Sequence, residues 1–372
     1  RTSPPCPMSF RPEPAFQHGQ PPKTAILLVN LGTPQAPTAS ALRRYLGQFL
    51  SDRRVVEIPA LIWKPILHGI ILRVRPAKSA AKYASIWMKD GSPLRVWTEK
   101  QTKLLQGFMG EAGHNVIVRH AMRYGEPSIA AELNALKQAG ATRILVLPLY
   151  PQYSGATTAS VLDDIYRWGL ETRLIPEMRM INRFHDDPGY IDALAQRIEQ
   201  HWRSHGRGQK LVMSFHGMPE HTLHKGDPYH CECHKTGRLL AHRLGLSADQ
   251  YVVTFQSRFG KAKWIEPYTE PTLHKLAKEG TESVDVVCPG FVADCIETLE
   301  EIAMEGKTAF LSSGGKAFQY IPCLNDDPQW IKAMVTLAER HLQGWPTRRE
   351  DQPSSDALEA QRSRANSMGS RG

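Results

Sequence analysis

Residues 115–149, NVIVRHAMRYGEPSIAAELNALKQAGATRILVLPL, decide the fold class of this chain. Two apolar runs in this stretch, NVIVRHAM (115–122) and RILVLPL (143–149), suit strands that are buried on both faces. The segment between them, PSIAAELNALKQAG (127–140), repeats apolar residues along one helical face and ends at a glycine. A strand, a helix and a second strand in this order predict a parallel sheet that is covered by helices.

The same pattern extends over the rest of the chain. Four further apolar runs are AILLV (25–29), KLVMSF (210–215), QYVVTF (250–255) and VDVVC (284–288), with helical patterns between several of them. Three strand–helix units fall in each half, and a Gly-x-Pro sequence follows the first strand of both halves. The sequence therefore predicts an α/β fold of two similar, doubly wound lobes with parallel sheets and a cleft between the lobes.

Composition excludes several classes of protein. Of the 372 residues, 41% are hydrophobic and 22% are charged, which excludes global disorder. Six cysteines are too few for a disulfide scaffold, so the chain does not require an oxidising compartment. The Pro-rich start has no signal-peptide core, and no apolar run reaches the roughly 18 residues of a membrane span. We therefore expect a cytoplasmic protein.

The pattern also predicts how the chain is divided. We expect a disordered extension over 1–23, an N-terminal lobe over 24–165, a C-terminal lobe over 166–312, a segment that packs back on the lobes over 313–345, and a disordered polar tail over 346–372.

Positive charge is concentrated in one part of the N-terminal lobe. Residues 43–103 contain 13 Lys or Arg and 4 Asp or Glu, a local excess of +9 that equals the net charge of the chain. Within them lies IPALIWKPILHGIILRVRP (58–76), which we call the lip. One interpretation is a core helix with charged edges, and the other is a surface that contacts lipid or an apolar anion at the membrane periphery. The segment has no nucleic-acid-binding motif, so we expect no nucleic acid partner.

The chemistry is expected beyond the carboxyl ends of the strands, where parallel sheets bind their ligands. None of the segments that follow the six runs contains GxGxxG or GxxxxGK[ST], which argues against a dinucleotide or P-loop nucleotide site. His216 ends the fourth run and is either a structural histidine or a proton acceptor and metal ligand. Asp294, Glu297 and Glu301 follow the sixth run with α-helical spacing on one face, as a solvated acidic face or as a track for a cation or protons.

The run His230-Cys231-Glu232-Cys233-His234 is rich in metal-ligating side chains. The other cysteines lack the paired CxxC spacing that zinc and iron–sulfur sites commonly use, so we do not expect a metal ion or cluster at this run, and its role stays open.

Six ordered motifs together resemble the ferrochelatase family, most closely its bacterial members. They are LLVNLGTP (27–34), MRYGEP (122–127), LPLYPQYSGATTAS (147–160), SFHGMPEHTLHKGDPYHCEC (214–233), TFQSRFGKAKWIEPYTE (254–270) and CPGFVADCIETLEEI (288–302). The resemblance covers about residues 24–345 and implies two Rossmann-like, chelatase-type lobes. It also implies the insertion of Fe²⁺ into protoporphyrin IX, the last step of heme biosynthesis, by a lyase that forms nitrogen–metal bonds.

The resemblance implies roles for individual residues. His216 and Glu297 match the family's catalytic and metal-binding pair, and Asp294 and Glu301 continue the path for protons or iron. The residues that match the porphyrin-binding positions are Asn30, Leu31, Arg123, Tyr124, Tyr153, Gln256, Ser257 and Trp264.

The resemblance also sets expectations for metals. Ferrous iron is expected as a substrate, with no cofactor required. The tail contains no cysteine, which argues against the [2Fe–2S] cluster that some relatives carry. Some relatives have His where this chain has Cys295, which leaves that outer metal position open. The alternatives are a two-lobed tetrapyrrole- or metal-binding protein without chemistry, and a cobalt or nickel tetrapyrrole chelatase, because a histidine and carboxylates do not select iron by affinity.

Overall fold

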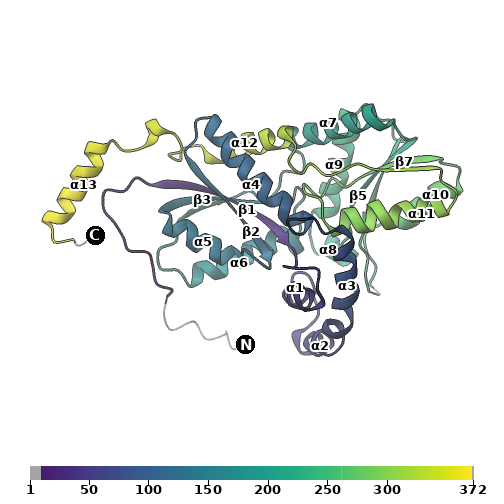
Figure 1. Ribbon diagram of the computed structural model, residues 1–372, viewed down its shortest axis with the longest axis horizontal. Coiled ribbons are helices and arrows are strands. Elements are labelled where there is room, and N and C mark those ends of the chain that lie inside the picture. Colours follow the sequence, from purple (N-terminus) through teal and green to yellow (C-terminus); the bar gives the residue numbers. More distant parts are fainter. Residues whose placement is uncertain (1–9, 261, 371–372) are drawn as a thin grey trace.

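Two four-stranded parallel sheets form the framework of the chain, and helices cover them (Figure 1). The computed structural model describes residues 10–260 and 262–370. Across the first sheet the strands are β2 (Val116–Tyr124), β1 (Lys23–Gly32), β3 (Ala141–Pro148) and β4 (Glu177–Met180), and across the second they are β6 (Tyr251–Gln256), β5 (Lys210–His216), β7 (Ser283–Val287) and β8 (Ala317–Tyr320). Both halves thus share one strand order, and the predicted α/β fold of two similar lobes is confirmed.

The helices of the first half carry the lip and cover the first sheet. They are α1 (Ala39–Ser51), α2 (Ala60–Ile66), the π-helix η1 (Leu67–Ile71), α3 (Leu72–Ile86), α4 (Pro93–Glu111), α5 (Ile129–Gln138), the π-helix η2 (Gly155–Ala159) and α6 (Ser160–Leu170). Several of these helices follow an N-cap residue whose side-chain oxygen accepts a backbone N–H of the first turn. These residues are Thr38 for α1, Ser92 for α4 and Ser128 for α5.

The helices of the second half repeat this arrangement around the second sheet and add a C-terminal extension. They are α7 (Pro188–His205), α8 (Glu220–His224), α9 (Tyr229–Arg243), α10 (Thr269–Lys278), the π-helix η3 (Glu297–Gly306), α11 (Lys307–Ser312), α12 (Pro328–Leu342), the 3-10 helix η4 (Arg349–Asp351) and α13 (Ser355–Ser367).

One hydrophobic core joins the two lobes. Ile26 and Leu28 of β1 belong to the same buried cluster as Met213 and Phe215 of β5. Helix α12, which follows the second sheet in the chain, returns to pack against both α7 and α4, and Trp330 at its start is fully buried. The ends of β1 and β5 are thereby held next to each other, and this places the functional site.

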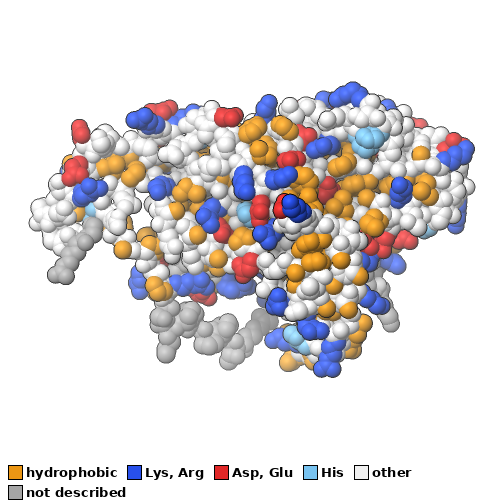
Figure 2. Space-filling model, in the orientation of Figure 1, with side chains coloured by type: hydrophobic (Ala, Val, Ile, Leu, Met, Phe, Trp, Pro, Cys, Tyr) orange, Lys and Arg blue, Asp and Glu red, His pale blue; other side chains and the backbone are white. Residues whose placement is uncertain are grey.

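The lip forms helices that protrude from the first lobe (Figure 1). Leu67 and Leu72 are buried against α1, whereas Leu61 is 93% exposed and Ile70 is 61% exposed. Hydrophobic side chains with adjacent cations gather on this protrusion (Figure 2). The lip is therefore a surface feature rather than a core helix.

Two edge strands shift the predicted lobe boundaries. Strand β4 pairs in parallel with β3, so the N-terminal lobe extends beyond residue 165, and β8 pairs with β7, so the C-terminal lobe extends beyond residue 312. Both strands are four residues long and only partly buried, and for this reason they lack the continuous apolar run that marks the other six.

The chain ends also differ from the expected disorder. In the extension, residues 1–9 lie outside the described residues, and Arg11 and Glu13 anchor the following segment to Glu171 and Lys137. In the tail, helix α13 is capped by Ser354 and buries Ala365, although most of its other residues are exposed. A capping serine followed by good helix formers such as Ala, Glu, Gln and Arg favours this helix without a large apolar face.

Candidate active site

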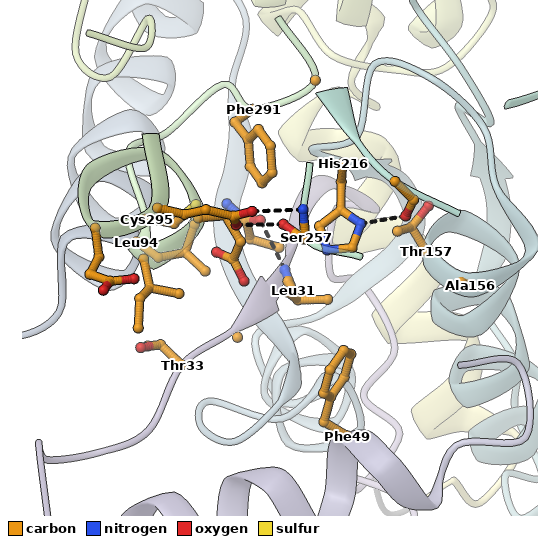
Figure 3. A pocket seen from close by; sticks show the side chains of 18 of the residues that line it. Leu31, Thr33, Phe49, Leu94, Ala156, Thr157, His216, Ser257, Phe291 and Cys295 are labelled. Atoms are coloured by element: carbon orange, nitrogen blue, oxygen red, sulfur yellow. Dashed lines mark hydrogen bonds between the residues drawn. The ribbon is translucent and has the colours of Figure 1, made fainter. Parts of the chain in front are cut away.

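A cavity of about 460 Å³ lies where β1 and β5 end, between the lip helix α3 and the π-helix η3. Figure 3 shows His216, Ser257 and Cys295 along this cavity, with Phe291 and Phe49 at its borders in this view. Of the residues proposed from the sequence, the cavity is lined by Asn30, Leu31, His216, Ser257, Trp264, Glu297 and Glu301. These seven come from four separate segments of the chain (30–31, 216, 257–264 and 297–301), which the fold brings together.

His216 is held with one ring nitrogen committed to the backbone. It is the last residue of β5, and its Nδ1 lies 2.7 Å from the carbonyl oxygen of Gly217, to which it donates. The lone pair of the neutral ring is then on Nε2. Tyr229 fixes the main chain here, because its hydroxyl donates to the His216 carbonyl at 2.9 Å.

Gly217 is required by a close backbone approach. A Cβ atom at this position would lie 2.6 Å from the carbonyl oxygen of Gln256 on the neighbouring strand β6. The glycine therefore lets β5 and β6 stay together up to the cavity.

Helix η3 carries a row of carboxylates into the cavity. Glu297, Glu300, Glu301 and Glu305 all line it. A π-helix forms i→i+5 hydrogen bonds and so has more residues per turn than the α-helix, which brings residues four apart onto one side. Glu297, Glu301 and Glu305 have this spacing.

Glu301 is the most strongly held carboxylate of this row. Ser257 donates its backbone N–H to Glu301 at 2.7 Å and its hydroxyl at 2.6 Å, and Gln256 donates a side-chain N–H at 3.3 Å. Burial raises the pKa of Glu301, although the Ser257 hydroxyl, His216 and the Ser257 amide oppose this rise. A raised pKa favours the protonated form and makes Glu301 a better proton acceptor than an exposed glutamate.

Asn30 orders the end of β1. Its side-chain N–H donates to the Thr98 hydroxyl at 3.0 Å, while its side-chain oxygen accepts the Leu31 backbone N–H at 2.9 Å. Asn30 is buried, and both Asn30 and Leu31 line the cavity, where Figure 3 shows Leu31.

The remaining wall is aromatic and apolar. Trp264 is 4% exposed and lies edge-on to Phe259, and its indole N–H has no hydrogen-bond partner among residues 10–260 and 262–370. On the opposite side Tyr45 and Tyr83 are buried, and burial raises the pKa of both phenols well above its usual value. Both side chains are therefore neutral at physiological pH, and the wall presents flat, uncharged surfaces.

Five of the proposed residues do not line the cavity. Arg123 pairs with Asp52 at 2.8 Å and with Asp164 at 3.2 Å, and the Tyr124 hydroxyl donates to the same Asp52 at 2.8 Å. Tyr153 contributes its backbone N–H to Glu232 at 2.7 Å. These three residues join elements of the lobes behind the cavity wall.

The other two lie directly behind the carboxylate row. Asp294 precedes η3 and accepts from Asn325 at 2.7 Å and from Thr298 at 2.8 Å, and Tyr320 also donates to it. Gln256 donates to the Glu297 carbonyl at 2.8 Å. Asp294 thus holds the start of η3 instead of continuing the track, which corrects the shared face expected from α-helical spacing.

The sequence interpretation did not assign several charged residues of the cavity to the site, among them Glu300, Glu305 and Lys82. Glu300 lies off the α-helical face that begins at Asp294, Glu305 lies on that face but one turn beyond Glu301, and Lys82 lies far away in the sequence on α3. The Lys82 ammonium lies 3.0 Å from the Glu300 carboxylate and 2.8 Å from Glu305. The closely spaced glutamates after residue 296 are the sequence signal that could have indicated Glu300 and Glu305 as cavity residues.

Metal-ligating side chains outside this row have ordinary structural contacts. The run His230-Cys231-Glu232-Cys233-His234 lies on α9, where Cys233 is buried and both histidine rings lie against Phe255. Over residues 10–260 and 262–370, no group of three or more His, Cys, Asp or Glu side chains is placed to hold a metal ion. In the same residues, no helix combines the length and apolarity needed to cross a membrane.

Comparison with known proteins identifies the family. The ferrochelatase family model matches residues 23–342. The chain is 64% identical to a ferrochelatase of Methylibium petroleiphilum and 65% identical to one of a Polaromonas species, in each case over 97% of this chain and 99% of the relative. A third ferrochelatase, from Dechloromonas aromatica, is 56% identical over 97% of this chain and 99% of its own length.

A solved structure shows the same fold at much lower sequence identity. SirB from Bacillus subtilis with Fe³⁺ superposes with a TM-score of 0.51 at 15% identity, covering 86% of this chain and 95% of that one. The family model covers most of the chain, and the relatives match it over nearly its full length. The chain therefore belongs to the ferrochelatase family.

Proposed function

We propose that this chain inserts ferrous iron into protoporphyrin IX and releases two protons, as the last step of heme biosynthesis. The observation that carries the proposal is the placement of His216 and a row of carboxylates around one aromatic cavity, in a chain of the ferrochelatase family. The cavity volume of about 460 Å³ is within the roughly 300–1,000 Å³ of small-molecule sites.

The walls of the cavity would bend the porphyrin ring. A flat porphyrin resists metallation because its N–H groups and lone pairs lie in the plane of the macrocycle. Trp264 on one lobe and the neutral face of Tyr83 on the other would grip the ring. A site that fits a bent ring better than a flat one lowers the barrier to metal insertion.

His216 has two available roles on the ring. Its Nδ1–H is donated to Gly217, so Nε2 offers a lone pair to the cavity. That lone pair can accept a pyrrole proton or bind the incoming iron, and imidazole is suited to both tasks. Glu297 is the first carboxylate of the row and would complete this pair.

The carboxylates of η3 supply the route to the ring. Glu301, with its raised pKa, would take up a proton and return it to solvent through the outer part of the row. Glu300 and Glu305 extend the row beyond Glu301 toward its half-exposed end and would attract ferrous iron. Asp294 and Gln256 act behind this row by fixing the position of η3.

The test of this function is a metallation assay under anaerobic conditions. Purified protein with Fe²⁺ and protoporphyrin IX should give the metalloporphyrin absorbance over many turnovers. His216→Ala and Glu297→Gln should each lower kcat by about 100-fold or more, the usual contribution of a proton-transfer group. His224→Ala and Glu279→Gln, both at exposed positions, serve as matched controls.

Two results would contradict the proposal. Saturation at one equivalent of porphyrin without turnover would indicate a binding protein. Turnover with Co²⁺ or Ni²⁺ but not Fe²⁺ would indicate a chelatase for another metal. Near-normal rates in both active-site variants would remove these residues from the chemistry.

We further propose that the lip contacts an anionic membrane surface. Leu61, Ile62 and Ile70 are 93%, 58% and 61% exposed, and Arg73 and Lys64 lie among them. Exposed apolar side chains beside cations fit the boundary between acyl chains and anionic headgroups. Such a contact would bring the cavity mouth close to an apolar substrate.

Vesicle sedimentation tests this contact. Vesicles of phosphatidylcholine with phosphatidylglycerol should bind the protein, and the double variant Leu61→Ser/Ile62→Ser should bind about tenfold more weakly. Arg73→Glu should reduce binding in low salt. Leu170→Ser alters a leucine that is 74% exposed on α6 and should bind normally. Equal binding by all variants would contradict the proposal.

A further inference from the structure

Lys82 occupies an unusual position in the cavity. It lies on α3, which belongs to the N-terminal lobe, yet its ammonium contacts two carboxylates of η3 in the C-terminal lobe. The distances are 3.0 Å to Glu300 and 2.8 Å to Glu305, and all three residues line the cavity. This ion-pair cluster therefore closes the outer end of the carboxylate row from the opposite wall.

The cluster is partly shielded from water. The Glu300 side chain is 11% exposed, whereas those of Lys82 and Glu305 are 46% and 55% exposed. Burial, together with Glu305, raises the pKa of Glu300, and Lys82 opposes this rise. Burial tends to lower the pKa of Lys82, but its hydrogen bonds to Glu305 and Glu300 outweigh burial and raise it. Lys82 is thus held in its protonated form, and its positive charge compensates the negative charge of the largely buried Glu300 carboxylate.

The same oxygens would attract a divalent cation. Carboxylates bind both ammonium groups and divalent metals, so the two compete when they share the same pair of acids. Lys82 has a flexible stem and a half-exposed side chain, and it can turn into solvent when displaced. Its position at the outer end of the row makes it the first charged group that an arriving metal ion would replace.

We propose that Lys82 is a gate residue, whose ammonium joins α3 to η3 until a divalent cation displaces it from Glu300 and Glu305. This inference rests on the proposed function, because it assigns the carboxylate row to metal entry. Lys82 is a positioning residue and does not touch the porphyrin nitrogens. Its presence lowers the affinity of the row for free metal and keeps the cavity mouth closed until metal arrives.

The first test is metal binding without porphyrin. A Co²⁺ titration, followed by the visible absorbance of the ion, should show about two- to fivefold tighter binding by Lys82→Met than by wild type, the size expected for a competing surface ion pair. Lys82→Arg retains the charge and should resemble wild type. Lys78→Met changes an exposed lysine one turn earlier on α3, which does not line the cavity, and should have no effect.

The second test is the steady-state reaction. Lys82→Met should lower the KM for the metal ion by a similar factor, while the KM for porphyrin changes less than about twofold. In the double variant Lys82→Met/Glu305→Gln, the decrease in the KM for the metal ion should be smaller. Residue 305 is then neutral, so Lys82 and the metal ion no longer compete for its charge. A merely structural lysine would instead lower kcat or thermal stability and leave the affinity for Co²⁺ unchanged.

The outcomes separate this inference from the proposed function. Unchanged or weaker Co²⁺ binding by Lys82→Met would overturn the gate even if the enzyme is active. Absence of chelatase turnover in wild type would overturn the proposed function, and the Co²⁺ titration would still decide on Lys82.

Discussion

Ser257 binds the Glu301 carboxylate with both its backbone N–H and its hydroxyl, at 2.7 and 2.6 Å. It does so from the left-handed region of backbone space, with a φ of 66°. Residues other than glycine avoid this region, and their presence there marks a conformation that the surrounding structure enforces. The backbone after β6 is thus held in a strained turn that aims two donors at one carboxylate.

Substitution of Ser257 separates its two contributions. Ser257→Ala removes the hydroxyl donor and retains the strain, so the pKa of Glu301 should rise further and the acidic limb of the activity profile should move to higher pH. Ser257→Gly also removes the hydroxyl but relieves the strain, and it should be more stable than Ser257→Ala by about 1 kcal/mol. Urea unfolding of both variants checks the difference, and equal stabilities would argue against strain.

Glu301 should also shape the pH dependence of stability. Its pKa is raised in the folded chain, so the folded state binds a proton more readily than the unfolded state. Stability from this group is therefore fully present below the unfolded pKa and is lost as pH rises through the folded value. Glu301→Gln should flatten this decline.

Urea titrations between pH 4 and 8 measure this effect. The difference in unfolding free energy between wild type and Glu301→Gln should favour wild type most at low pH and shrink toward neutral pH. Glu279→Gln changes an exposed glutamate and should give a constant difference. If the difference in unfolding free energy between wild type and Glu301→Gln instead grows in favour of wild type as the pH rises, the pKa of Glu301 is lowered in the folded chain.

Arg123 should be important for stability more than for substrate binding. Its side chain is 12% exposed and pairs with Asp52, which is 5% exposed. Removing one member of a buried pair leaves the other unpaired, so Arg123→Ala should destabilise the chain by about 3–5 kcal/mol. The double variant Arg123→Ala/Asp52→Ala should be less destabilised than the sum of the two single changes.

Kinetics of the same variant decide between the two roles. If Arg123 acts through folding alone, the folded variant assayed at low temperature should keep its KM for porphyrin within about twofold. A KM increase of about tenfold with normal stability would instead indicate direct contact with the substrate.

Helix α13 should contribute little to the fold. Ala365 is buried, and most other side chains of the helix are exposed. Truncation after residue 353 should therefore shift the thermal midpoint by less than about 2–3 °C, since a change of about 1 kcal/mol moves a chain of this size by a few degrees. Calorimetry measures this shift, and a loss of about 10 °C would show that the helix supports the lobes.

The framework of the fold was predictable because buried parallel strands have a distinct sequence pattern. The six strands found from the sequence are those with continuous apolar runs, such as LLV in β1 and VMSF in β5. Strands β4 and β8 read EMRM and AFQY. At a sheet edge the burial is incomplete, so the pattern that identifies a strand is absent.

The site was predictable at the strand ends and less so beyond them. His216 and Leu31 follow the rule that ligands bind at the carboxyl edge of the sheet, and both line the cavity. Arg123 and Tyr124 also lie at the end of a strand, β2, but their side chains pair with Asp52 and do not line the cavity. A place at the carboxyl end of a strand therefore does not by itself bring a side chain into the cavity.

The carboxylate row shows a second limit. An α-helical period groups Asp294 with Glu297, Glu301 and Glu305, whereas in the structure the π-helix begins at Glu297 and leaves Asp294 in front of the row. Nothing in the residues from 294 to 306 distinguishes the two periods in advance. Lys82 was also beyond reach, because its contact joins positions more than 200 residues apart.

The core that joins the lobes limits how a wide, flat molecule can enter. Ile26 and Phe215, from different lobes, belong to one buried cluster, so swinging the lobes apart would expose that cluster to water. The shared core therefore holds the two lobes together and prevents a hinge motion between them. A flat substrate would therefore have to enter through local movement at the rim, where α3 meets η3 and the exposed or half-exposed charges of Lys82 and Glu305 are part of the contact.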